Sequence, residues 1–89
     1  MQTIELIVKG DVQGVSYRYF AKSEAKRLGL SGWAKNEHDG TVLIIVQGDT
    51  DKISEYIKWA KNGSPMASVE EVRLNEIEFK KIFKGFEVK

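Results

Sequence analysis

The chain has 89 residues, of which 42% are hydrophobic and 30% are charged, so it is expected to form one small globular domain over residues 1–89 and not a disordered chain. Fourteen basic and 13 acidic residues leave a net charge of +1, which gives no overall attraction to nucleic acid or to an anionic membrane. The chain has no cysteine and one histidine, His38, which excludes disulfides, thiol catalysis, zinc–thiolate sites and multi-histidine metal sites.

The first half of the chain shows a strand, a helix and a second strand. Alternating apolar residues predict a strand over residues 3–9, and a loop with two glycines follows it. Ser16 is the expected N-cap of a helix that Gly29 can end. Residues 31–37 resume an extended pattern, and Asp39-Gly40 is a strong signal for a two-residue hairpin turn.

The second half completes a β-α-β-β-α-β order. Residues 41–46 are apolar on both faces, which predicts a central strand. Asp49-Thr50-Asp51 begins a second helix that Gly63 stops, residues 69–74 indicate a fourth strand, and residues 84–88 could form a short terminal strand. This order predicts an α+β, ferredoxin-like split β-α-β fold with a four-stranded antiparallel sheet and both helices on one face. Such a fold hosts enzymes, RNA binders and regulatory modules alike.

The loop between the first strand and the first helix suits an anion. Gly10 and Gly14 let the backbone approach a ligand and turn its N–H groups inward. The helix N-terminus adds unpaired donors, and Arg18 adds a permanent charge in a fork geometry that matches phosphate. The alternative is a strand-to-helix turn with a surface arginine, and the spacing alone leaves these two interpretations even.

Three other polar residues invite a chemical role. Asn36 lies near the end of the second predicted strand, where asparagine is depleted; it could orient a water or a substrate oxygen, although local hydrogen bonding at the turn explains it better when it is taken alone. His38 is expected to be a solvated turn residue, and Asp11 is expected to face outward because its carboxylate would repel an anion. Trp33 and Trp59 are expected to be packing residues.

A short motif near the end of the chain points weakly to RNA. Lys84-Gly85-Phe86 resembles the opening of an RNA-recognition motif. That motif belongs on the third strand of the RNA module, however, and residues 41–46 carry no aromatic side chain. RNA stacking is therefore a weak hypothesis.

Two longer motifs resemble the signatures of the acylphosphatase family. The pattern G-x-V-Q-G-V-x-[FY]-R is matched by residues 10–18, and G-[FYW]-[AVC]-[KRQAM]-N-x-x-x-G-x-V is matched by residues 32–42. Gly63-Ser64-Pro65 and the residues that follow it also resemble the family. Ser16 stands where vertebrate members often carry cysteine. The similarity spans nearly the whole chain.

The resemblance implies a metal-free hydrolase that cleaves acyl phosphates into a carboxylate and inorganic phosphate. By this resemblance Arg18 and Asn36 are catalytic: Arg18 binds the phosphoryl oxygens and Asn36 holds the attacking water. The backbone amides of six residues would complete a phosphate cradle: Gln13, Gly14, Val15, Ser16, Tyr17 and Arg18. No cofactor or metal is implied. An acyl phosphate is a mixed anhydride with a good leaving group, so positioning and charge stabilisation suffice.

The partners follow from the same resemblance. We expect a small-molecule acyl phosphate substrate, with phosphate or sulfate as competing anions, and no nucleic acid or membrane partner. Glu5 and Lys9 interrupt the first apolar run, so the start of the chain does not resemble a signal peptide. No apolar stretch is long enough to span a membrane, and we therefore expect a cytoplasmic protein. The sequence leaves the oligomeric state open, and a monomer is the expectation. Two hypotheses compete with the enzyme. The first is a binding or regulatory module, either alone or inside a larger protein, and the end of the chain at residue 89 argues against the larger protein. The second is an RNA-binding domain.

Overall fold

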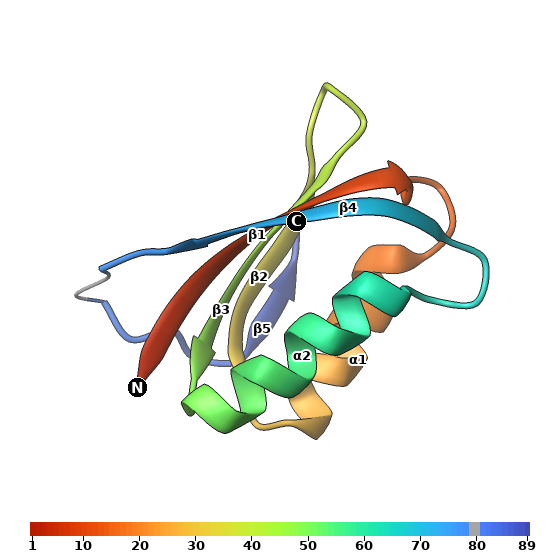
Figure 1. Ribbon diagram of the computed structural model, residues 1–89. Coiled ribbons are helices and arrows are strands. Elements are labelled where there is room, and N and C mark those ends of the chain that lie inside the picture. Colours follow the sequence, from red (N-terminus) through yellow and green to blue (C-terminus); the bar gives the residue numbers. More distant parts are fainter. Residues whose placement is uncertain (79–80) are drawn as a thin grey trace.

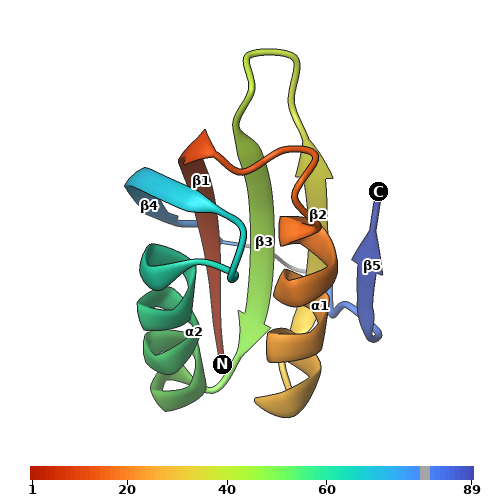
Figure 2. The same cartoon turned by 90° about the vertical axis from the view of Figure 1, so that its right-hand side faces the viewer.

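A five-stranded sheet carries two helices on one of its faces in the computed structural model, which describes residues 1–78 and 81–89 (Figures 1 and 2). The elements in chain order are β1 (Gln2–Asp11), α1 (Tyr17–Arg27), β2 (Ser31–Asn36), β3 (Val42–Gly48), α2 (Thr50–Asn62), β4 (Ser68–Glu76) and β5 (Phe86–Val88). The predicted β-α-β-β-α-β order is therefore present, with β5 as a further strand at its end.

The sheet differs from the prediction in one respect. Its order is β4-β1-β3-β2-β5, and the first four strands pair antiparallel, but β5 pairs with β2 in parallel. The expected four-stranded antiparallel sheet is thus a five-stranded mixed sheet. The reason lies in Phe86, which is 7% exposed and packs into the core. Burial of this ring brings the last segment along the free edge of β2, where the backbone of Gly32 pairs with it.

The core fills the space between the sheet and the helices. Alternate residues of β1 and of the central strand β3 face the helices, and α1 and α2 contribute small and aromatic residues at helical spacing. The fully buried members of this set are Leu6, Val8, Val42, Ile44, Val46, Tyr17, Ala21, Ala25, Ile53, Tyr56 and Ala60. Ile45 on the other face of β3 is also buried, and β3 lies in the middle of the sheet order, so the prediction of a central strand is confirmed.

Two tyrosine hydroxyls join the helices. Tyr17 donates to the Ala60 carbonyl oxygen at 2.9 Å, and Tyr56 donates to the Ala21 carbonyl oxygen at 3.0 Å. The Trp59 ring lies 5.2 Å from the Tyr17 ring and 5.5 Å from the Tyr56 ring, which confirms Trp59 as a packing residue. These contacts fix the start of α1, and with it the place of Arg18. Within the described residues, neither helix is long and apolar enough to cross a membrane.

Candidate active site

The loop between β1 and α1 has the backbone geometry of an anion-binding nest. Gly14 and Ser16 have φ angles of +75° and +63°, whereas Val15 and Tyr17 have negative φ. Residues that alternate between left- and right-handed conformations turn their successive N–H groups toward one side. Ser16 occupies the N-cap position of α1 as expected, but its side chain makes no capping hydrogen bond. A capping side chain needs an extended backbone at this position, and Ser16 has a left-handed one.

The N–H groups of this loop are free to bind a ligand. Among the described residues, no acceptor takes a hydrogen bond from the backbone N–H of residues 13–18, and the first donors in use belong to Tyr19 and Phe20, which both bind the Ser16 carbonyl oxygen at 3.2 Å. The first turn of α1 also contains no acidic residue. Six unpaired donors at a helix N-terminus without a nearby carboxylate on that helix create a positive local potential.

Arg18 and Asn36 come together in one cavity from distant parts of the sequence. The cavity has a volume of about 240 Å³. Its lining residues are Val12, Gly14, Ser16, Tyr17, Arg18, Tyr19 and Asn36. Arg18 extends from the first turn of α1, and its Nη1 donates a hydrogen bond to the main-chain oxygen of Lys89, just after β5. Asn36 ends β2 on the same strand face as the buried Ala34, which is the face that the helices cover.

The Asn36 side chain holds an unused acceptor. Its Oδ1 is buried and receives no hydrogen bond from any donor in the described part of the chain. Buried polar atoms are nearly always hydrogen-bonded in folded proteins, and a catalytic role is one explanation for an exception. This geometry favours the functional interpretation of Asn36 over the local turn interpretation.

Gln13 has a positioning role that the sequence did not reveal. Its Nε2 donates to the carbonyl oxygens of Glu37 and Thr41, at 2.7 and 2.9 Å. These two residues form the neck of the β2–β3 hairpin, where the Glu37 N–H also donates to Thr41. Gln13 therefore ties the anion loop to the segment that follows Asn36. Of the six residues predicted to bind phosphate, Gln13 and Val15 do not line the cavity, whereas two residues that were not predicted, Val12 and Tyr19, do.

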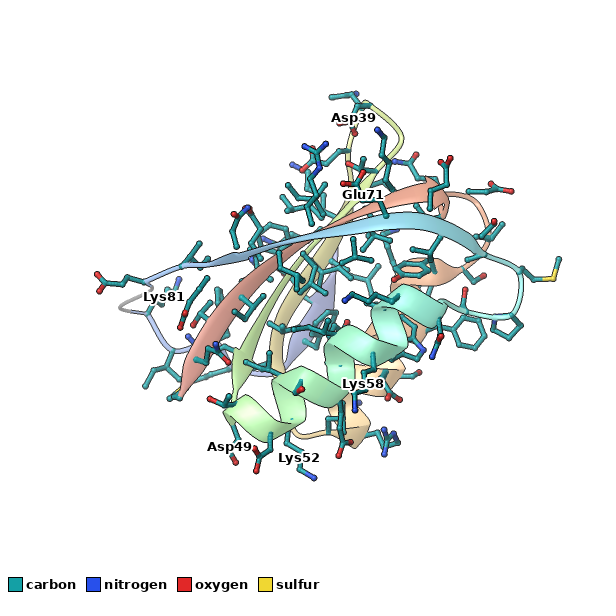
Figure 3. All side chains as sticks on the ribbon, in the orientation of Figure 1. Asp39, Asp49, Lys52, Lys58, Glu71 and Lys81 are labelled. Carbon is teal, nitrogen blue, oxygen red and sulfur yellow. The ribbon has the colours of Figure 1, made fainter. Side chains whose placement is uncertain are left out.

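The remaining candidates lie away from the cavity. His38 is exposed in the β2–β3 hairpin, which confirms it as a turn residue, and Asp11 at the end of β1 is also exposed. Asp39, at the tip of this hairpin in Figure 3, accepts hydrogen bonds from Thr41 Oγ1 at 2.7 Å and Thr41 N at 3.0 Å, and these bonds lower the pKa of its carboxyl. Phe86 of the RNA-like motif is buried in the core, so its ring is not available to stack on a base. No group of three or more His, Cys, Asp and Glu that could hold a metal ion occurs in residues 1–78 and 81–89.

Comparison with known proteins agrees with both motifs. The profile of the family described as Acylphosphatase matches residues 4–88. An acylphosphatase from Thiobacillus denitrificans is 44% identical over 87 residues, which are 98% of this chain and 96% of that protein. One from Azoarcus sp. is 49% identical over 71 residues, covering 80% of this chain and 72% of that protein. The chain belongs to the acylphosphatase family. It is a hydrolase of acyl phosphates, as the resemblance implied.

Solved acylphosphatases share the whole fold. The crystal structure of the Bacillus subtilis acylphosphatase is 35% identical, with a TM-score of 0.96 over 100% of this chain and 99% of that one. The Coxiella burnetii acylphosphatase is 34% identical, with a TM-score of 0.94 over 99% of this chain and 92% of that one. A much longer protein, full-length HypF, contains a similar part: the match is 27% identical with a TM-score of 0.90, and it covers 99% of this chain but 12% of HypF.

Proposed function

We propose that Arg18 and Asn36 carry out the hydrolysis in the 240 Å³ cavity that they line together. In this proposal the backbone amides of residues 13–18 hold the phosphoryl oxygens, and Arg18 adds bidentate contacts to them. One observation carries the proposal: three kinds of group lie around one small cavity. They are the permanent cation of Arg18, the buried Oδ1 of Asn36, which has no hydrogen-bond donor among the described residues, and the unpaired backbone N–H groups of the loop.

The reaction is a displacement at phosphorus by water. Oδ1 of Asn36 accepts a hydrogen bond from the water and directs its oxygen at the phosphorus atom, on the side opposite the acyl oxygen. A new P–O bond forms, the P–O bond to the acyl group breaks, and the electron pair leaves with the carboxylate. The amide cannot take the water proton, so the proton passes to the substrate phosphate or to solvent.

Arg18 and the loop stabilise the charge that spreads over the equatorial oxygens. They are in place before the reaction begins, so little reorganisation is needed. The carboxylate product has a low pKa, which removes the need for a general acid at the leaving oxygen. Arg18 has five N–H donors and uses one on Lys89, so the remaining donors are available for the phosphoryl group.

Replacement of Arg18 tests this proposal. We expect Arg18→Ala to lose about 2–4 kcal/mol of transition-state stabilisation, or roughly 30- to 1,000-fold in kcat/KM with benzoyl phosphate. Arg18→Lys should also be badly impaired, because a point charge cannot reproduce the fork of the guanidinium. Arg27→Ala is the matched control, since Arg27 lies on the same helix and pairs with Glu24, away from the cavity. Near-normal kcat/KM in a folded Arg18→Ala protein contradicts the proposal.

The same site supports the finer expectations about partners. Inorganic phosphate and sulfate should inhibit competitively, because both are tetrahedral anions that fit the loop donors. The expected monomer stays a prediction. Light scattering after gel filtration tests the monomer, and a dimer as the active species contradicts it. The cytoplasmic location stays a prediction.

A further inference from the structure

A second, larger groove lies beside the active-site cavity at the β5 edge of the sheet. It has a volume of about 680 Å³ and is formed by α1, β2 and the segment 81–89. Figure 2 shows α1 and β5 next to each other on this side of the molecule. Tyr19 lines both the groove and the cavity, and Arg18 contacts the main chain of Lys89, which lines the groove. The two spaces are therefore neighbours that share a wall.

The groove concentrates positive charge. Four lysines line it: Lys22, Lys81, Lys84 and Lys89. Within the described residues, none of these ammonium groups forms an ion pair with a carboxylate, and Glu87 is the one acidic residue in the lining. The whole chain has a net charge of only +1, so this concentration is local and not a property of the surface in general. A cleft lined by charges of one sign attracts ligands of the opposite sign.

Aromatic side chains also form part of the groove wall. Trp33 lines it and is partly buried, and the Lys89 ammonium lies 4.5 Å from the centre of the Trp33 ring. Phe83 lines the groove as well. Aromatic walls with ammonium groups beside them suit a ligand that has an apolar or flat body and an anionic end.

The spacing along α1 sets where such a ligand would lie. Lys22 follows Arg18 by four residues, so the two side chains are neighbours on one helix face, about 6 Å apart along the axis. Tyr19 lies between the two spaces. A phosphoryl group held at Arg18 can therefore extend its acyl group past Tyr19 into the groove, where Lys22 lines the wall.

We propose that this groove binds the acyl part of the substrate and favours acyl groups that carry a second anion, either a carboxylate or a phosphate-like group. This inference rests on the proposed function, because it places the phosphoryl group at Arg18. A nucleic acid is the less favoured occupant, since Phe86 is buried and leaves the motif at residues 84–86 without a stacking ring.

A matched pair of substrates tests the groove. Benzoyl phosphate and 4-carboxybenzoyl phosphate share one ring and differ by one carboxylate, so the ratio of their kcat/KM values isolates the effect of the second charge. We expect the ratio to favour the carboxylated substrate by about threefold to tenfold at low salt, as for one or two exposed charge pairs, and to approach one above about 0.5 M salt. The analogue 4-phosphonobenzoyl phosphate shows whether a phosphate-like second anion gains more than a carboxylate.

Lysine substitutions locate the effect. The double variant Lys22→Gln, Lys84→Gln is expected to lower the ratio toward one, whereas Lys58→Gln on the exposed side of α2 keeps the wild-type ratio (Figure 3). A wild-type ratio near one at low salt overturns the inference, and so does a preference that survives in the double variant. These outcomes differ from failure of the proposed function, which is read from Arg18→Ala with benzoyl phosphate alone.

Discussion

The choice of asparagine at position 36 shapes the chemistry that the site can perform. An amide is neutral at all relevant pH values, so in the proposed mechanism it orients a water without repelling a phosphoryl dianion, which a carboxylate at the same place would do. Its Oδ1 is buried without a partner, which costs folding free energy unless a water or ligand supplies the hydrogen bond. The positive charge of the site comes instead from Arg18 and the loop amides.

Replacement of Asn36 separates water orientation from phosphate binding. We expect Asn36→Ala to lower kcat by about 100-fold, the scale for removing a group that orients a reacting atom, while the inhibition constant of inorganic phosphate changes little. The measurements are steady-state kinetics and competitive inhibition by phosphate. Lys35→Ala, an exposed neighbour on the same strand, serves as the control. A large rise in the inhibition constant with kcat preserved would assign Asn36 to substrate binding.

At the scale of single residues, some features of the site could be predicted from the sequence and others could not. Glycine spacing and two signatures single out Arg18 and Asn36 as candidates, and the structure places both in one cavity. The unused Oδ1 of Asn36 and the double contact of Gln13 depend on tertiary distances across 24 to 28 residues of sequence, which no local pattern encodes. The left-handed backbone of Ser16 was also missed, because a serine before a helix normally indicates an ordinary cap.

At the scale of elements, the site depends on how the anion loop and the β2–β3 hairpin are joined. The loop carries the N–H donors and leads into Arg18, and the hairpin follows Asn36. The Gln13 amide is the side chain that links them, through two hydrogen bonds to the hairpin neck. Arg18 is held separately by its contact with Lys89. We therefore expect the distance between Arg18 and Asn36 to depend on Gln13.

This arrangement predicts that Gln13 acts through Asn36. Gln13→Ala removes two partly buried hydrogen bonds, so we expect a loss of about 1–3 kcal/mol in unfolding free energy and a clear fall in kcat. In the Asn36→Ala background, the same substitution should lower kcat no further, because there is no side chain left to position. A double-mutant cycle on kcat, with denaturant unfolding of all four proteins, measures both effects. Effects of Gln13→Ala and Asn36→Ala that simply multiply would contradict a positioning role.

The elements themselves were largely predictable. Strands and helices with strong periodicity, such as β1, β3 and α2, lie within a few residues of their predicted positions. The terminal strand β5 was predicted, but its place in the sheet was not. It has three residues, and the direction in which it pairs depends on where the Phe86 ring finds space in the core. Such a choice is made by tertiary packing and not by local propensity.

At the scale of the whole molecule, one buried layer holds the site together. The helices contact each other through the reciprocal bonds of Tyr17 and Tyr56, and they cover one face of the sheet (Figure 1). Tyr17 belongs both to this layer and to the lining of the cavity. Loss of the layer therefore removes the geometry around Arg18 as well as the fold.

The buried tyrosines predict alkaline unfolding with a defined slope. Burial raises the pKa of both Tyr17 and Tyr56 above the ordinary value of 10.0. A raised folded pKa means that the stability from each phenol is complete below pH 10 and is lost as the pH rises above it, because the unfolded chain releases the proton first. Each buried tyrosine should therefore contribute a slope of about 1.4 kcal/mol per pH unit to the unfolding free energy above pH 10.

Tyr56→Phe isolates one of these two contributions. The variant loses the hydrogen bond to the Ala21 carbonyl, so we expect it to be about 1 kcal/mol less stable at pH 7, but its free energy of unfolding should fall less steeply above pH 10, by about 1.4 kcal/mol per pH unit. Lysine titration is common to both proteins and cancels in the comparison. Denaturant unfolding followed by circular dichroism between pH 7 and 11.5 provides both numbers, with Tyr19→Phe, at an exposed position, as the control for the loss of one tyrosine. Equal slopes in the wild type and Tyr56→Phe would show that the Tyr56 phenol ionises within the folded protein, and the buried layer would then be looser than the structure indicates.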